Sequence, residues 1–262
     1  MKRRLDEEIV RRNLLNSRNE AKVFILEGKV SVNGVKAIKP SELVSEEDSI
    51  EILSSKEYVS RGGYKLASAL STFNIDVREK VCVDIGASTG GFTHCLLKNG
   101  ARRVYAIDVG SGLLDPIIRE NPKVTLIENF NARFLSPNVI NEHVGIVTID
   151  VSFISILKII PGVKEIICED ADIISLIKPQ FEGEPRYLKK GIVKNEDFHK
   201  IILKRVRDGI KDMGLVVINA TYSPIRGGKG NIEFFFHIKK KGEFANDELL
   251  DKIVEEAWEH TK

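Results

Sequence analysis

The 262-residue sequence has few cysteines, little net charge and no long apolar stretch. Its three cysteines form no C-x-x-C pair, and an odd number cannot all pair within one chain, so a reducing compartment fits best. No apolar run approaches the ~18 residues of a membrane-spanning helix, and we expect no membrane partner. Residues 1–8 begin with three basic side chains after Met1 but lack the apolar stretch of a secretory signal. These absences predict a cytoplasmic protein.

Histidine is also scarce, and the five histidines show no spacing typical of a metal site, so we predict no bound metal. The formal net charge of +2 neither requires nor excludes a nucleic-acid partner, which makes the distribution of charge the informative feature. Residues 1–40 carry ten basic and five acidic side chains, whereas residues 41–60 carry one lysine and six acids. A basic part confined to one segment is typical of a surface that meets phosphates.

Local patterns in the first sixty residues predict a small α+β module. Apolar spacing indicates a helix over residues 5–14, and Ser17 followed by Glu20 forms a capping box that opens a second helix. Asn33-Gly34 is a strong hairpin turn between two short strands, and residues 49–53 read as a closing strand. Two helices on a few short strands make a small core that can fold.

This module resembles the small RNA-binding domain of a small-subunit ribosomal protein, which also occurs in tyrosyl-tRNA synthetases and pseudouridine synthases. The matching segments are Arg4-Leu5-Asp6, Ser17-Arg18, Gly28-Lys29-Val30 and Val32-Asn33-Gly34. The resemblance implies that residues 1–55 bind RNA and that Arg4, Arg18, Lys22 and Lys29 face it. Charge alone would fit a solvated basic helix face equally well. Residues 56–63 are predicted to be a linker.

Residues 64–262 alternate between predicted strands and helices. Strands are expected at 81–85, 104–108, 124–127, 146–151, 173–177, 215–220 and 233–238, with helices at 64–70, 91–99 and 197–211 among others. Apolar strands in alternation with helices indicate an α/β domain with a parallel sheet covered on both faces. Such sheets bind ligands beyond the carboxyl ends of their strands.

A glycine-rich loop, residues 84–93, follows the first of these strands. It matches neither G-x-G-x-x-G, because Ser88 occupies the place of the second glycine, nor the phosphate-binding P-loop. Asp84 precedes the first glycine, and Asp108 ends the next strand, 22 residues after Gly86. An acid at that second position can bind ribose hydroxyls. An acid on the first strand would suit a cationic amino acid, so the pair favours S-adenosylmethionine over NAD. A glycine turn without a ligand is the alternative.

Four polar residues lie at strand or helix ends of the same domain: Lys65, Asp150, Lys178 and Glu233. Asp150 and Lys178 end two successive parallel strands, so both must emerge at the edge that carries the glycine loop. An isolated lysine at a strand end is usually a solvated charge, so the residues alone give only a candidate site.

The large domain resembles the TlyA family, whose members are known as hemolysin A or as ribosomal RNA 2′-O-methyltransferases with an FtsJ-like catalytic domain. The matching segments are Ser60–Leu66, Asp84–Thr93, Asp150–Ser155, Lys178–Glu182 and Gly230–Phe234. The resemblance implies a Rossmann-like class I methyltransferase sheet, S-adenosylmethionine as cofactor and a cytidine ribose in ribosomal RNA as substrate. The catalytic Lys–Asp–Lys–Glu set of FtsJ-type enzymes maps onto Lys65, Asp150, Lys178 and Glu233.

The same resemblance extends the expected cofactor site. Asn131 stands where many methyltransferases have an acid near the adenine. The expected cofactor-binding residues are Asp84, Gly86, Ala87, Ser88, Gly90, Gly91, Phe92, Asp108, Asn131 and Asp150. Ribosomal RNA or ribosomal subunits are the implied partners.

The expected chemistry requires a base, because an alcohol is a poor nucleophile until its proton leaves. A lysine amine is normally protonated at neutral pH, but a second lysine nearby and partial burial both favour its neutral form. We hypothesise that Lys178 is the base and that Asp150 orients its amine. Lys65 and Glu233 would complete the network and hold the ribose.

Other functions compete with this interpretation. The hemolysin name suggests a membrane-active cytolysin, which would need a membrane-inserting segment that is not visible in the sequence. A non-enzymatic RNA-binding factor in ribosome assembly is a further alternative. The glycine spacing disfavours an NAD-dependent dehydrogenase, and the type of catalytic domain disfavours a pseudouridine synthase. The modified nucleotide, its ribosomal subunit and the oligomeric state stay open.

Overall fold

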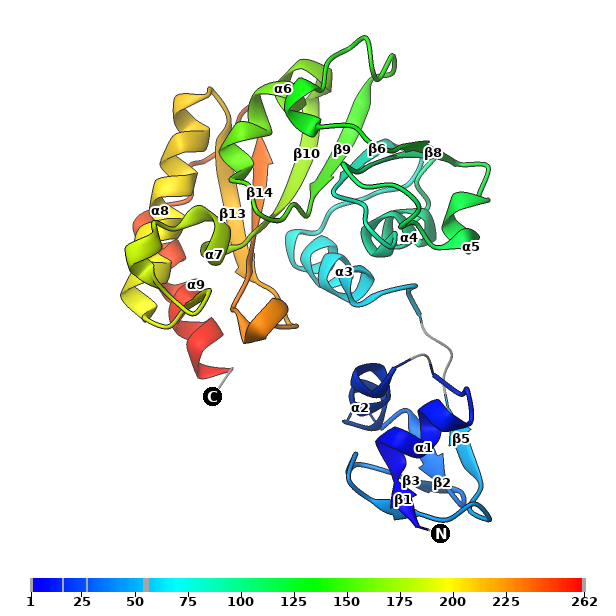
Figure 1. Cartoon of the computed structure of the whole chain (residues 1–262). Helices are drawn as coiled ribbons and strands as arrows, with labels where there is room; N and C mark the ends of the chain where they lie inside the picture. The colour runs from blue at the N-terminus through cyan, green and yellow to red at the C-terminus, as the bar shows by residue number, and fades with distance from the viewer. Residues whose placement is uncertain (1, 16, 27, 54–56, 261–262) are drawn as a thin grey trace. The chain divides into compact units, whose positions relative to one another are not determined.

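The computed structural model describes residues 2–15, 17–26, 28–53 and 57–260, and the chain divides into two compact units, Met1–Glu57 and Tyr58–Lys262 (Figure 1). Residues 58–63, predicted as part of a linker, belong to the second unit. Tyr58 is 5% exposed within its core, and a β-carbon at Gly63 would collide with the Tyr58 ring. Lys56, at the start of the predicted linker, lies outside the described residues.

The small unit packs two helices against short antiparallel strands. Its elements are β1 (Arg3–Arg4), α1 (Leu5–Arg11), α2 (Arg18–Leu26), β2 (Val30–Val32), β3 (Val35–Lys36), β4 (Leu43–Val44) and β5 (Ile50–Ile52). The first helix is shorter than the predicted 5–14, because Asn13 adopts a left-handed φ of 54° that ends it. The other predicted features are present: the Ser17 hydroxyl accepts the Glu20 N–H, and Asn33-Gly34 turns between β2 and β3. The second strand pair, β1–β4, was not predicted.

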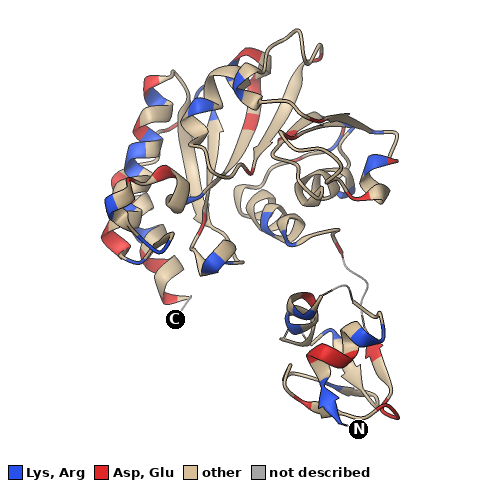
Figure 2. Ribbon diagram, in the orientation of Figure 1, with Lys and Arg blue, Asp and Glu red and all other residues tan. Residues whose placement is uncertain are grey.

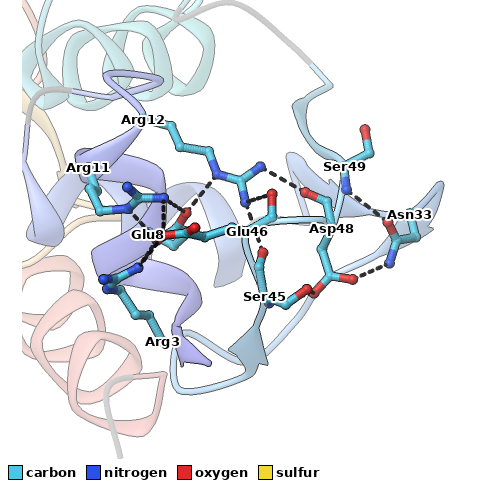
Figure 3. Close-up of polar contacts among 9 residues, drawn as sticks. All are labelled: Arg3, Glu8, Arg11, Arg12, Asn33, Ser45, Glu46, Asp48 and Ser49. Carbon is cyan, nitrogen blue, oxygen red and sulfur yellow. Dashed lines mark hydrogen bonds and ion pairs between the residues drawn. The ribbon is translucent and has the colours of Figure 1, made fainter. Parts of the chain in front are cut away.

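A buried carboxylate stabilises the small unit from within. Acidic and basic residues share α1 (Figure 2), and Glu8 among them is only 1% exposed. Arg11 donates two hydrogen bonds to Glu8, at 2.8 and 2.7 Å, and Arg12 donates a third at 2.8 Å. Arg12 also donates to the carbonyl oxygens of Ser45 and Asp48, which ties α1 to the loop after β4 (Figure 3). These guanidinium groups lower the pKa of Glu8 to about 2.

The large unit is built on a seven-stranded sheet of order β13-β14-β10-β9-β6-β7-β8. Its strands are β6 (Val81–Ile85), β7 (Arg103–Ile107), β8 (Val124–Ile127), β9 (Val144–Ile149), β10 (Ile167–Ile177), β13 (Val216–Tyr222) and β14 (Phe234–Lys239). The expectation of a wholly parallel sheet is wrong at β14, which runs antiparallel to both of its neighbours. The reason lies in the connection, because residues 223–233 contain no crossover helix and return the chain directly beside β13.

Helices cover both faces of this sheet, as predicted. On one face α3 (Arg61–Phe73) and α4 (Gly91–Lys98) share a core with the sheet, and on the other lie α6 (Ile160–Ile166), α8 (Glu196–Asp212) and α9 (Asp247–Glu259) (Figure 1). The shorter elements are α5 (Pro116–Arg119), α7 (Pro179–Glu182), β11 (Leu188–Lys189) and β12 (Ile192–Val193). Within the described ranges, no helix combines the length and apolarity needed to cross a bilayer.

Replacing Glu8 by glutamine should destabilise the small unit at pH 7 by about 1.5–3 kcal/mol, the usual worth of hydrogen bonds to a charged group. Because the pKa of Glu8 is lower in the folded chain than its ordinary 4.5, its contribution is complete above pH 4.5 and is lost as the pH falls toward about 2. Amide NMR signals of α1 and β2, followed against urea at several pH values, would measure this. A Glu8→Gln variant whose acid sensitivity between pH 4.5 and 2 equals that of the natural protein would contradict the assignment.

Candidate active site

The glycine loop after β6 runs in direct contact with the end of β9. Gly86 has a left-handed φ of 84°, and a β-carbon there would collide with the backbone carbonyl oxygen of Asp150. The N–H groups of Gly86 and Ala87 both donate to the Ile107 carbonyl, at 2.9 and 3.1 Å. The Asp150 N–H donates to the Ile85 carbonyl at 2.9 Å. Only glycine permits this approach, which brings Asp150 to the loop.

A pocket of about 220 Å³ opens above this loop. Its lining includes seven of the predicted site residues: Lys65, Gly86, Ala87, Ser88, Gly91, Phe92 and Asp150. Ser60, Arg61, Gly62 and Thr89 complete the lining. The first three come from the segment predicted as linker, which therefore forms one wall of the pocket. Six other predicted site residues lie outside the lining: Asp84, Gly90, Asp108, Asn131, Lys178 and Glu233.

Asp84 is buried beneath the loop. The hydroxyl groups of Thr93 and Thr148 donate to its two carboxylate oxygens, at 2.7 and 2.9 Å. Complete burial raises its pKa to about 6, against the opposing effect of these hydrogen bonds. Asp84 thus supports the loop by linking β6 to α4 and β9.

Asp108 and Asn131 hold neighbouring turns in shape. The carboxylate of Asp108 accepts the N–H groups of Ser88 and Gly110, both at 2.8 Å, and so joins the glycine loop to the turn after β7. Asn131 caps a short helical turn by accepting the N–H of Arg133 at 3.1 Å. Gly90, with a φ of 90°, opens α4 and packs against Leu114.

The four charged residues predicted to be catalytic form two ion pairs at this edge of the sheet. Lys65, on the first turns of α3, contacts Glu233 just before β14, with 2.6 Å between Nζ and Oε2. Lys178, directly after β10, contacts Asp150 with 2.6 Å between Nζ and Oδ1. Lys65 and Asp150 both line the pocket, so each pair contributes one residue to its lining. Glu233 is 2% exposed, whereas the Asp150 side chain is 23% exposed.

Sequence reasoning missed several side chains that support these pairs. The Lys178 ammonium donates to the Ser152 hydroxyl at 2.9 Å, and the Gln180 amide donates to Glu233 at 3.3 Å. A β-carbon at Gly227 would collide with the Glu233 carboxylate, so Gly227 makes room for it. These three residues lie within or beside the segments that carry the family resemblance. Neither the polarity of the first two nor the presence of a glycine marks them as functional in the sequence.

Phe153 is the most unexpected residue of the site. Its side chain is 90% exposed and its φ is 64°, a conformation that bulky side chains rarely adopt. Its ring packs against Phe181 at 4.8 Å between centroids. An isolated phenylalanine in a sequence indicates core packing, so only the structure identifies it as a surface residue beside Ser152.

The four residues of the small unit that were predicted to face RNA differ in their contacts and burial. Arg4 and Arg18 both form ion pairs with Asp6, which is fully buried, at 3.0 and 3.3 Å. Each arginine still exposes a large part of its side chain, 40% and 49%. The Lys29 ammonium lies 5.8 Å from the centre of the Phe24 ring. Lys22 is half-buried on α2.

Comparison with known proteins identifies both units. Residues 58–240 match the family model of the FtsJ-like methyltransferases, and residues 3–50 match the S4 domain. The chain belongs to the FtsJ-like methyltransferase family. It is an enzyme, and the resemblance to the TlyA family is confirmed by relatives that align over most of the chain.

Two of these relatives carry the names expected from the sequence. Hemolysin A of Brachyspira hyodysenteriae is 43% identical over 89% of this chain and 98% of its own. The 16S/23S rRNA (cytidine-2′-O)-methyltransferase TlyA of Mycobacterium tuberculosis is 38% identical over 97% of this chain and 95% of its own. A solved structure described as a hemolysin from Streptococcus thermophilus is 37% identical, with a TM-score of 0.77 over 99% of this chain and 96% of that one. This FtsJ-like methyltransferase thus aligns over most of its length with proteins of both names.

Replacing Gly86 by alanine should disrupt the junction of the glycine loop with β9. Left-handed backbone costs alanine roughly 1–2 kcal/mol, and the collision with the Asp150 carbonyl adds to that cost. Gly112 is a matched control, because its φ of 68° imposes similar strain while nothing lies within 4 Å of its β-carbon position. Urea unfolding of Gly86→Ala and Gly112→Ala would compare them. Equal losses would show that the contact with Asp150 has no energetic consequence.

Proposed function

We propose that this FtsJ-like methyltransferase transfers a methyl group from S-adenosylmethionine to the 2′-hydroxyl of a cytidine in ribosomal RNA. The observation that carries the proposal is that the ion pairs Lys65–Glu233 and Lys178–Asp150 each contribute one residue to a pocket lined by the glycine loop. The relative from Mycobacterium tuberculosis is named a 16S/23S rRNA (cytidine-2′-O)-methyltransferase, which supports the same substrate.

The residues at the pocket fit S-adenosylmethionine. The backbone of Gly86, Ala87 and Ser88 lines the pocket, and any side chain at Gly86 would disrupt it. Backbone without side chains lets a ligand approach closely, and the carboxylate of Asp150 beside it suits a cationic group. When bound, the cofactor supplies a methyl group on a positively charged sulfur. Asp108 and Asn131 would contact the nucleoside end, while Asp84 would act through the loop that it supports.

Lys178 is the proposed base. Its amine lies between the Asp150 carboxylate and the Ser152 hydroxyl, at 2.6 and 2.9 Å, and so is held beside Asp150, which lines the pocket. Once neutral, the amine accepts the proton of the 2′-hydroxyl, and Asp150 keeps it aimed at the ribose. A base placed in this way contributes roughly 10²–10⁴ in rate.

Lys65 and Glu233 form the second, more deeply buried pair. The carboxylate of Glu233 is held by Lys65 and by the amide of Gln180. Because both oxygens are engaged, the pair has a fixed position and would hold the ribose by hydrogen bonds. Fixed geometry of this kind supplies much of the remaining acceleration.

The S4 unit has a separate task in this proposal. A catalytic site that accepts a single ribose reads too little of the RNA to select one position in ribosomal RNA. A second RNA-binding surface raises the effective concentration of the target and limits its orientation. Arg4, Arg18, Lys22 and Lys29 are the residues that we propose for this contact.

Lys178→Ala and Lys178→Arg should both lower ribose methylation by at least roughly 10²-fold, while binding of S-adenosylmethionine stays unchanged. Arginine keeps the positive charge but cannot lose its proton, so it separates a base from a purely electrostatic role. Mass spectrometry of ribosomal RNA from strains with and without the gene, and of RNA methylated in vitro by each variant, would measure the outcome.

Ser152→Ala is the control for this pair, since it removes a contact of Lys178 and leaves the amine in place. We expect a much smaller loss of methylation from it. Normal methylation by Lys178→Arg would remove Lys178 from the role of base. The absence of any methyl group added by the natural protein would overturn the proposed function itself.

The exposed ring of Phe153 offers a stacking surface for a base beside the target ribose. Base–aromatic stacking is worth about 1–3 kcal/mol, so Phe153→Ala should lower kcat/KM for RNA roughly 10- to 100-fold. Because the ring is 90% exposed, its removal should leave unfolding and cofactor binding unchanged. Phe153→Trp should restore activity. Full activity of the alanine variant in steady-state methylation would contradict the stacking role.

A further inference from the structure

Three exposed lysines, Lys189, Lys190 and Lys229, form a cluster that we name the lysine ridge. They lie on two loops of the large unit that are rich in positive charge (Figure 2). Residues 183–194, which connect α7 to α8, contain four basic side chains and one acid. Residues 223–232, which connect β13 to β14, contain two basic side chains and no acid. Because the whole chain has a net charge of only +2, this concentration is local.

A buried asparagine fastens the two loops together. Asn231 is 3% exposed, and its amide nitrogen donates to the carbonyl oxygens of Gly191 and Gly228 at 3.1 and 3.0 Å. Its amide oxygen accepts the N–H of Val193 at 3.4 Å. A β-carbon at Gly191 would lie 3.4 Å from Nζ of Lys229, so the tip of one loop touches the lysine of the other. The ridge is therefore a single surface.

Turn geometry does not explain the lysines at the two tips. Lys190 and Lys229 have φ values of 56° and 57°, and each precedes a glycine that also has a positive φ. Asparagine, aspartate and glycine are the residues that favour such positions. Lysine adds a charge there without helping the backbone, which indicates a role for the charge itself.

The ridge also lacks internal neutralisation. The ion pairs nearby join Glu184 to Arg186 and to Arg205. In the part of the chain that the structure describes, no carboxylate lies within ion-pair distance of Lys189, Lys190 or Lys229. Three like charges held together without acids favour a polyanionic partner.

The ridge adjoins the proposed catalytic residues. The Ser223 N–H donates to the Glu233 carbonyl at 2.8 Å, which closes the loop that bears Lys229. Gly227 of the same loop packs against the Glu233 carboxylate. We propose that the lysine ridge binds backbone phosphates of the RNA strand that flanks the target ribose. This inference rests on the proposed function and adds the surface that would guide the strand to the pocket.

The test compares two triple variants of the full chain that remove the same charge. The ridge variant carries Lys189→Gln, Lys190→Gln and Lys229→Gln. The control variant replaces three exposed lysines elsewhere in the large unit, on α6, after β14 and on α9: Lys164→Gln, Lys241→Gln and Lys252→Gln. Binding of transcribed 16S and 23S rRNA is measured at several salt concentrations. Each lost phosphate contact on a single strand reduces the slope of log affinity against log salt by ~0.7.

We expect the slope of the ridge variant to be smaller by about 2, because three lost contacts contribute ~0.7 each. Its affinity near 0.1 M salt should be at least tenfold lower. The control should match the natural protein. The KM of the control variant for RNA should equal that of the natural protein. The ridge variant should have a higher KM and nearly the same kcat. If the slope of the ridge variant equals that of the control, the ridge does not bind phosphates and is an ordinary solvated face. Failure of the natural protein to methylate RNA would instead overturn the proposed function, because the binding slope is measured without methylation.

Discussion

The candidate active site depends on one steric constraint, the contact of Gly86 with the Asp150 carbonyl. In a parallel sheet the loops after adjacent strands lie side by side, and a side chain on either would separate them. Gly86 has none, so the loop after β6 can press against the end of β9. This contact places the Asp150 side chain in the wall of the pocket that the glycine loop lines. Proton transfer and methyl donation therefore occur within one small space in the proposed reaction.

Charge pairing is the second constraint on the site. A buried charge is costly unless it is paired, and the four charges are arranged as two pairs of opposite sign. The pairs differ in exposure. The side chains of Lys65 and Glu233 are 10% and 2% exposed, whereas those of Lys178 and Asp150 are 12% and 23% exposed. The more accessible pair can meet a hydroxyl group from solvent, and the more buried one can hold the surrounding geometry. The difference lies in the two carboxylates, because the exposed fractions of Lys65 and Lys178 are almost equal.

The sequence predicted features that depend on neighbouring residues better than features that depend on packing. The Asn33-Gly34 turn and the Ser17 cap follow from local chemistry, and both are present. The shared edge of Asp150 and Lys178 follows from the topology of parallel strands. The exposure of Phe153 could not be predicted, because an apolar residue is normally buried and only tertiary structure turns it outward. The direction of β14 was predictable in principle from its missing crossover helix.

The two basic surfaces of the chain differ in how their side chains are paired with acids. Arg4 and Arg18 of the small unit are held by the buried carboxylate of Asp6, which cancels part of their charge while fixing their direction. A guanidinium held in this way loses less conformational entropy on binding a phosphate, and it gains specificity from its planar geometry. The lysine ridge has flexible side chains and, within the described residues, no acid partner, so its attraction is long-ranged and sensitive to salt. Arginines of the first kind suit the recognition of a defined RNA shape, whereas the lysines suit the capture of a strand whose sequence is read elsewhere.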